Sequence, residues 1–88
     1  MIDKDDRSAI AGEIARRALA IRISKQIDRK VIADALGSTS TRVSRIENGT
    51  ARLSAAELVV LARALNVPTS VLVGDIPATD RWEIADAY

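Results

Sequence analysis

Residues 28–49 read DRKVIADALGSTSTRVSRIENG, and this stretch decides the fold. Apolar residues recur in it at three- and four-residue spacing on both sides of Gly37, which predicts two short helices. Asp28 and Thr39 are residue types that favour helix N-caps, and glycine is favoured where a left-handed residue ends a helix. Only residues 37–39 would then connect the helices. Two short helices joined by so tight a glycine-containing turn form a helix-turn-helix unit.

A longer helix is predicted before this unit. It begins near residues 5–6, where either of two aspartates can cap it, and it ends near Ser24. Its apolar stripe keeps helical spacing and consists of Ile10, Ile14, Ala18 and Ile21. The apolar face of the helix after Asp28 consists of Val31, Ile32, Ala35 and Leu36. Both faces are expected to turn toward the core.

Two further helices are predicted after the unit. Residues 54–57, SAAE, are a capping-box sequence, and the helix that follows ends at residues 66–68, where the chain reads NVP. A last helix of one to two turns is predicted at Thr69–Val73. The chain is therefore expected to be all-α, with residues 1–74 as the domain and residues 75–88 as a tail that carries a short helix.

Composition excludes several classes of function. The 88 residues include neither Cys nor His. Their absence removes thiolate nucleophiles, imidazole bases, disulfides and the usual transition-metal ligands, so we expect no enzyme, no cofactor and no metal site. The acidic start of the sequence does not resemble a signal peptide, and no apolar run approaches the roughly 18 residues that a membrane helix needs. We therefore expect a cytoplasmic protein that does not contact membranes.

Positive charge is concentrated in the stretch that predicts the helix-turn-helix. The net charge of the chain is only +1, but residues 29–52 hold five basic and two acidic residues, which makes this segment +3. A local basic face suits a polyanion such as duplex DNA. An ordinary solvated helix face would have the same composition, so charge alone does not decide the function.

Three segments together resemble the Cro/repressor (XRE) family of helix-turn-helix proteins. They are residues 31–37 (VIADALG), 43–49 (VSRIENG) and 58–72 (LVVLARALNVPTSVL), and the resemblance extends over about residues 18–74. It implies the five-helix fold of lambda-repressor-like domains, in which the third helix enters the major groove and the start of the second faces the phosphate backbone. Members of the family are mostly sequence-specific regulators that bind palindromic sites as dimers.

The sequence departs from the family pattern at three positions. Arg29 follows the N-cap of the second helix, where the family often has Gln, and this change should keep or strengthen a phosphate contact. Gln26 stands where Gly is usual. Leu53 replaces the proline that is common after the third helix, so this loop is expected to differ.

The outward side of the helix predicted at residues 40–47 supplies the candidates for contact with DNA bases. Val43 and Ile46 are three residues apart and are expected to face inward. Ser40, Thr41, Ser44 and Arg45 then lie wholly or partly outward, and the docking of the family places Ser40, Thr41 and Ser44 nearest the base edges. Arg45 and Arg42 are the further candidates. Hydroxyl groups can hydrogen-bond to several bases, and an arginine can bind guanine through two hydrogen bonds or hold a phosphate instead. For each side chain taken singly, solvated helix surface is the alternative.

Side chains near the two helix starts and the following turn are the candidates for phosphate contacts. They carry positive charge, hydroxyl or amide groups and are Arg29, Lys30, Thr39, Asn48, Thr50 and Arg52. Thr39 has a competing role as an N-cap, and Asn48 can instead satisfy the turn.

Glu47 is an acidic residue on an element that is expected to face DNA. In the family the corresponding acid pairs with an arginine of the first helix, and Arg22 occupies that position here. The resemblance therefore implies a structural ion pair between Arg22 and Glu47.

The tail leaves two functions open. Trp82, Ile84 and Tyr88 are candidates for dimer contacts, because aromatic residues are favoured at interfaces, although Trp82 can also fold back on its own domain. The predicted function is a sequence-specific transcription regulator, a repressor that binds duplex DNA as a homodimer. The alternative is an antitoxin-like module whose tail binds a protein partner.

Overall fold

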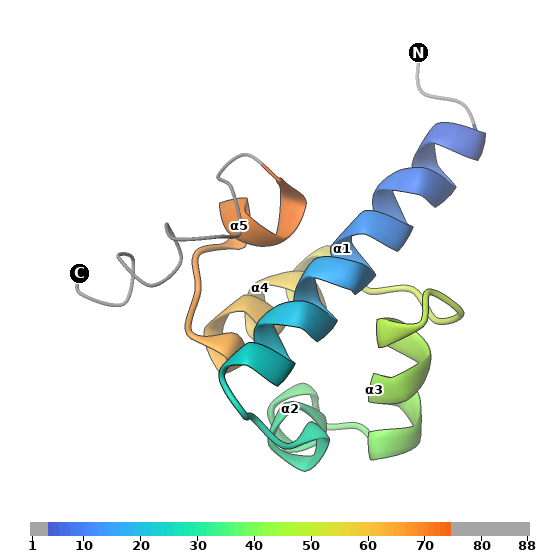
Figure 1. Cartoon of the computed structure of the whole chain (residues 1–88). Helices are drawn as coiled ribbons and strands as arrows, with labels where there is room; N and C mark the ends of the chain where they lie inside the picture. The colour runs from blue at the N-terminus through green and yellow to red at the C-terminus, as the bar shows by residue number, and fades with distance from the viewer. Residues whose placement is uncertain (1–3, 75–88) are drawn as a thin grey trace.

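A computed structural model of the chain describes residues 4–74, and these fold as five α-helices without a strand (Figure 1). The helices are α1 (Lys4–Ser24), α2 (Arg29–Leu36), α3 (Ser40–Glu47), α4 (Ala55–Leu65) and α5 (Thr69–Val73). The predicted all-α class is confirmed, and each helix predicted for the domain is present. The helix predicted for the tail lies outside the described residues.

The helix-turn-helix consists of α2, α3 and the three residues between them. The Asp28 carboxylate accepts a hydrogen bond from the Lys30 N–H (2.9 Å), and the Thr39 hydroxyl accepts one from the Arg42 N–H (3.1 Å). Gly37 ends α2 with a φ of 63°, in the left-handed conformation that glycine adopts without steric cost. The predicted caps are confirmed, and they fix the short turn that sets α3 against α2.

Polar residues also define the ends of α4 and α1. Ser54 Oγ accepts a hydrogen bond from the Glu57 N–H (3.1 Å), and Glu57 Oε1 accepts one from the Ser54 N–H (3.0 Å), which confirms the predicted capping box. Asn66 ends α4 in the left-handed region with a φ of 59°. Gln26 follows α1 with a φ of 58°, a conformation that costs a non-glycine residue about 1–2 kcal/mol.

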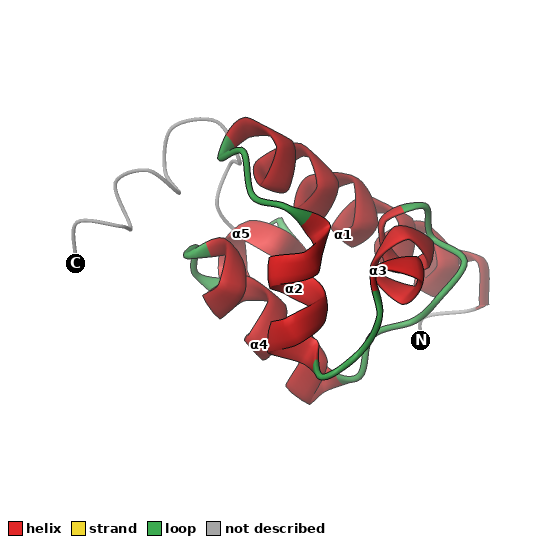
Figure 2. Cartoon of the chain, turned by 90° about the horizontal axis from the view of Figure 1, so that it is seen from below, coloured by secondary structure: helices red, strands yellow, loops and turns green. Residues whose placement is uncertain are grey.

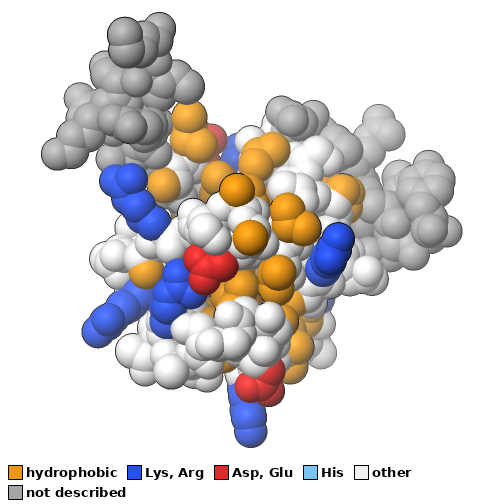
Figure 3. Space-filling view, turned by 180° about the vertical axis from the view of Figure 1, so that it is seen from behind, with side chains coloured by type: hydrophobic (Ala, Val, Ile, Leu, Met, Phe, Trp, Pro, Cys, Tyr) orange, Lys and Arg blue, Asp and Glu red, His pale blue; other side chains and the backbone are white. Residues whose placement is uncertain are grey.

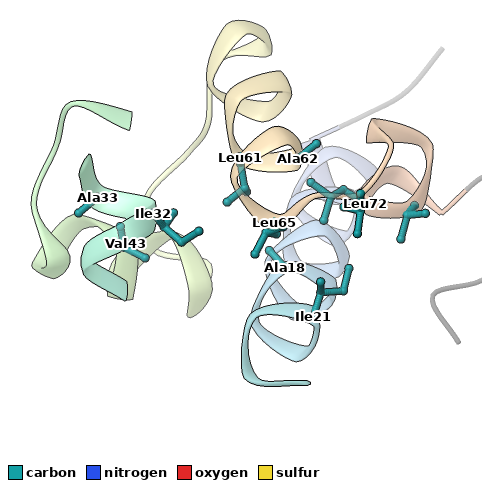
Figure 4. Packing of buried hydrophobic residues seen from close by; sticks show 11 residues of the cluster. Ala18, Ile21, Ile32, Ala33, Val43, Leu61, Ala62, Leu65 and Leu72 are labelled. Carbon is teal, nitrogen blue, oxygen red and sulfur yellow. The ribbon is translucent and has the colours of Figure 1, made fainter. Parts of the chain in front are cut away.

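The core lies where the five helices meet. α2 packs against both α3 and α4, while α1 packs against α3, α4 and α5 (Figures 1 and 2). Aliphatic side chains converge from these helices (Figure 4). The largest fully buried ones are Ile21, Ile32, Val43, Leu65, Val71 and Leu72. Because α3 contributes Val43 to this core, packing as well as the turn determines its orientation.

Some residues expected on apolar faces are exposed. Ile10 is 46% exposed because the first turns of α1 project beyond the other described helices, which do not cover the start of its stripe (Figure 1). Val31 and Ala35 are exposed because α2 turns Ile32 and Ala33 toward the core. The predictions that Ile10, Val31 and Ala35 face inward are therefore wrong.

Candidate nucleic-acid interface

The outer side of α3 presents small hydroxyl groups and one arginine to solvent. Val43 and Ile46 are buried in the core, as predicted from their spacing. Ser40, Thr41 and Arg45 are exposed and Ser44 is half-buried. Within the described part of the chain, the side chains of these four residues make no hydrogen bond or ion pair. Their donors and acceptors are therefore available to a ligand.

Arg42 has a different environment from the other α3 residues proposed to contact bases. Its Nη1 lies 2.6 Å from Glu57 Oε2 and its Nη2 lies 3.0 Å from Glu57 Oε1. Nη2 also donates to the Arg52 carbonyl oxygen at 3.1 Å. These contacts hold the guanidinium of Arg42 at the start of α4, and a contact of Arg42 with a base stays a prediction.

The Arg42–Glu57 pair links the start of α3 to the start of α4. The hydrogen bond from Arg42, together with that from the Ser54 N–H, lowers the pKa of Glu57 to about 2 from an ordinary value of 4.5. The same hydrogen bond raises the pKa of Arg42. Glu57 is therefore ionised across the physiological range, so its charge is available to the pair.

The turn after α3 is held by two residues that were candidates for phosphate contacts. Asn48 Oδ1 accepts hydrogen bonds from the Thr50 N–H (3.1 Å) and the Thr50 hydroxyl (2.6 Å). The Thr50 hydroxyl also lies 3.3 Å from the Arg45 carbonyl oxygen. Both side chains are exposed, so they support the turn at a surface that borders the outer side of α3.

The basic candidates divide into free and paired side chains. Lys30 and Arg52 are exposed, and their side chains make no hydrogen bond within residues 4–74. Arg29 is half-exposed, and its Nε donates to Glu47 Oε1 at 3.0 Å. The spacing of Arg29 and Glu47 in the sequence gave no signal for this contact, because only the packing of α2 against α3 brings the two residues together.

Arg22 and Glu47 form a buried ion pair between α1 and α3. Arg22 Nε lies 2.5 Å from Glu47 Oε2, and Nη2 lies 3.3 Å from Oε1. Arg22 Nη1 donates to the Ile27 carbonyl oxygen at 2.8 Å. Since these hydrogen bonds satisfy both charged groups, the end of α3 is fixed to the end of α1 without an unpaired buried charge.

Basic side chains are unevenly distributed over the surface. On the face opposite to that of Figure 1, hydrophobic side chains gather near the middle, and Lys and Arg side chains project around them, more of them on the left of the view than on the right (Figure 3). A cavity of about 210 Å³ is lined mainly by alanine and aliphatic side chains of α1, α4 and the loop after α3. This lining is unsuited to acid–base chemistry.

The described residues form neither a metal-binding cluster nor a membrane-spanning helix. Across residues 4–74, no group of three or more His, Cys, Asp or Glu residues is arranged to hold a metal ion. None of the helices in the same range combines the length and the apolar character that crossing a membrane requires. The exposed side chains of α2, α3 and their flanking turns are thus the candidate site.

Comparison with known proteins agrees with this geometry. Residues 19–72 match the family model described as helix-turn-helix. No curated protein matches the chain. The matched segment spans more than half of the chain and includes α2, α3 and α4. The chain belongs to the Cro/repressor (XRE) family of helix-turn-helix proteins, which are DNA-binding transcription regulators.

Proposed function

We propose that the chain is a repressor that recognises a palindromic operator in duplex DNA as a dimer. In this proposal α3 enters the major groove, and Ser40, Thr41, Ser44 and Arg45 contact base edges. The supporting observation is that these side chains lie on the outer side of α3 and have no hydrogen-bond or ion-pair partner among residues 4–74. Hydroxyl groups and an arginine are suitable donors for the base edges of the major groove.

Phosphate contacts would hold α3 in the groove. Lys30 and Arg52 are exposed, and their charged groups have no partner among residues 4–74. Arg29 is the first residue of α2. Asn48 and Thr50 support the turn after α3, where backbone N–H groups and their own side chains can approach a phosphate. Thr39 caps α3, so its contribution would come mainly from fixing the helix start. Arg42 has a structural role in this proposal.

Dimerisation would double the contacts with DNA. We assign it to the tail, through Trp82, Ile84 and Tyr88, which lie outside the described residues. Two copies of α3 would then enter successive major grooves about 34 Å apart. The protein acts by binding rather than by catalysis, in the cytoplasm and without a cofactor. A tail that binds a different protein, as in an antitoxin, is the second candidate.

Selection from randomised duplex DNA at physiological salt tests the proposal. The purified chain is expected to enrich one palindromic sequence, and the spacing of its half-sites would report the dimer. A promoter carrying that sequence should then be less active when the chain is present. Folded protein that enriches no sequence would contradict sequence-specific regulation and direct attention to a protein partner of the tail.

A further inference from the structure

One buried carboxylate in the helix-turn-helix binds two arginines. Glu47 is almost inaccessible, with 7% of its side chain exposed, and Arg22 fixes it with two hydrogen bonds. Its Oε1 also accepts the Nε–H of Arg29 at 3.0 Å. The ends of α1 and α3 and the start of α2 therefore meet at a single carboxylate.

The three charges do not cancel. Two guanidinium groups and one carboxylate leave a net charge of +1 in the cluster. Arg22 is buried with 11% of its side chain exposed and is compensated by Glu47, whereas 46% of the Arg29 side chain is exposed. The uncompensated positive charge therefore lies on Arg29, at the surface.

Arg29 also retains hydrogen-bond donors. A guanidinium carries five N–H donors in a planar fork, and Arg29 donates only its Nε–H to Glu47. Its two terminal nitrogens make no hydrogen bond with any residue in the described range. A pair of phosphate oxygens fits such a free fork, whereas a lysine has one nitrogen and presents no planar fork.

We infer that Glu47 is a positioning residue that holds Arg29 by its Nε, so that the terminal nitrogens of Arg29 are already oriented to bind a DNA phosphate. The inference rests on the proposed function, since it requires the chain to bind duplex DNA. Anchoring reduces the rotamer freedom that Arg29 loses on binding. The buried ion pair thereby contributes to the phosphate site as well as to the fold.

Variants of Arg29 separate this role from simple neutralisation of Glu47. The probe is a short mixed-sequence duplex, and the affinity of the full chain is measured over a range of salt concentrations. We expect R29Q to lower the magnitude of the salt slope by about 0.9, the value of one phosphate contact. We expect R29K to keep the slope and bind about two- to tenfold more weakly. R63Q removes an exposed arginine of α4 and serves as the matched control.

Glu47 is tested with E47Q in two backgrounds, with affinities corrected for the folded fraction measured by circular dichroism. Positioning predicts that E47Q weakens binding about two- to tenfold when Arg29 is present and has no further effect in R29Q. Equal losses in both backgrounds would show a structural role alone and overturn the inference. If E47Q does not fold, the comparison of R29K with the native chain decides, and equal affinities overturn the inference.

The outcomes also separate this inference from the proposed function. A native chain that binds the duplex, together with an R29Q slope equal to that of the native chain, overturns the role of Arg29 and leaves DNA binding intact. A folded native chain that binds no duplex even at low salt overturns the proposed function, and this inference falls with it.

Discussion

Arg45 is the exposed side chain of α3 with the greatest capacity to discriminate between bases. It extends from the outer side of the helix without a partner among the described residues, and arginine can bind guanine through two hydrogen bonds. We expect R45A to weaken binding to the selected operator by about 1–3 kcal/mol, with a much smaller loss on a scrambled duplex. Titration of both duplexes measures the difference. An equal loss on both would show that Arg45 holds a phosphate instead.

Gln26 and Gly37 form a matched pair for backbone strain, because both adopt positive φ values near 60°. Q26G should stabilise the fold by up to about 1 kcal/mol, because relief of steric strain outweighs the added freedom of the unfolded chain. G37A should destabilise the fold by about 1 kcal/mol or more. Backbone strain is the cause, because no atom of the described residues lies within 4 Å of the added methyl group. Urea unfolding measures both changes. A destabilised Q26G would show that the Gln26 side chain has a stabilising contact.

The charged residues show how far sequence reasoning reaches at this scale. The resemblance implied that Arg22 would pair with Glu47, and the structure brings the two together. Arg42 is a candidate for contact with guanine or phosphate because it is an arginine of α3, but its side chain binds Glu57, fifteen residues further along the chain. Arg29 likewise meets Glu47 across eighteen residues. Such pairs depend on how helices pack, and the spacing of residues along the chain does not record this.

Among the helices, the contact between the starts of α3 and α4 depends on the ionisation of Glu57. Its pKa of about 2 in the folded chain is below the ordinary value of 4.5, so the folded state binds this proton less tightly than the unfolded state. The stabilisation is therefore complete above about pH 4.5 and is lost as the pH falls toward 2.

E57Q tests this contact, because glutamine retains the capping-box hydrogen bond and removes the charge. At neutral pH we expect E57Q to be less stable than the native chain by no more than about 1 kcal/mol, since the pair is partly exposed to solvent. The difference should shrink between pH 4.5 and 2. Unfolding free energies of both proteins over this range measure it. A difference that does not change with pH would assign the effect to the cap and not to the ion pair.

The helix boundaries could be predicted because their signals are local. Asp28, Thr39 and Ser54 each hydrogen-bond to backbone within three residues, so the sequence around each cap contains both partners. Burial was less predictable at the helix ends. Ile10 has the spacing of a core residue, yet none of α2 to α5 reaches the first turns of α1 to cover it. Whether an apolar face is covered depends on the length and placement of neighbouring helices.

At the scale of the whole molecule, ion pairs connect both ends of α3 to the neighbouring helices. Arg42 and Glu57 fix its start to α4, and Glu47 fixes its end to α1 and α2. These ion pairs connect both ends of α3 to neighbouring helices, so we expect its outer side to be held in one orientation. A fixed orientation favours recognition, because little conformational freedom is left to lose on binding. In the proposed function one domain would contact one half-site, so tight operator binding would require a second copy.

We expect the tail to make the contacts that join two copies of the chain. Removing residues 75–88 tests this expectation. The shortened chain should be monomeric by sedimentation, while the full chain should dimerise. Its affinity for the palindrome should fall about a hundredfold or more, because the second half-site no longer binds as an intramolecular event. Affinity for a single half-site should not change, since α2 and α3 remain intact.

W82A should likewise weaken dimerisation and lower the affinity for the palindrome, and W82F should keep the dimer if the interface requires an aromatic ring. A shortened chain that still dimerises would locate the interface within residues 1–74, and the tail would then be available to bind a different protein.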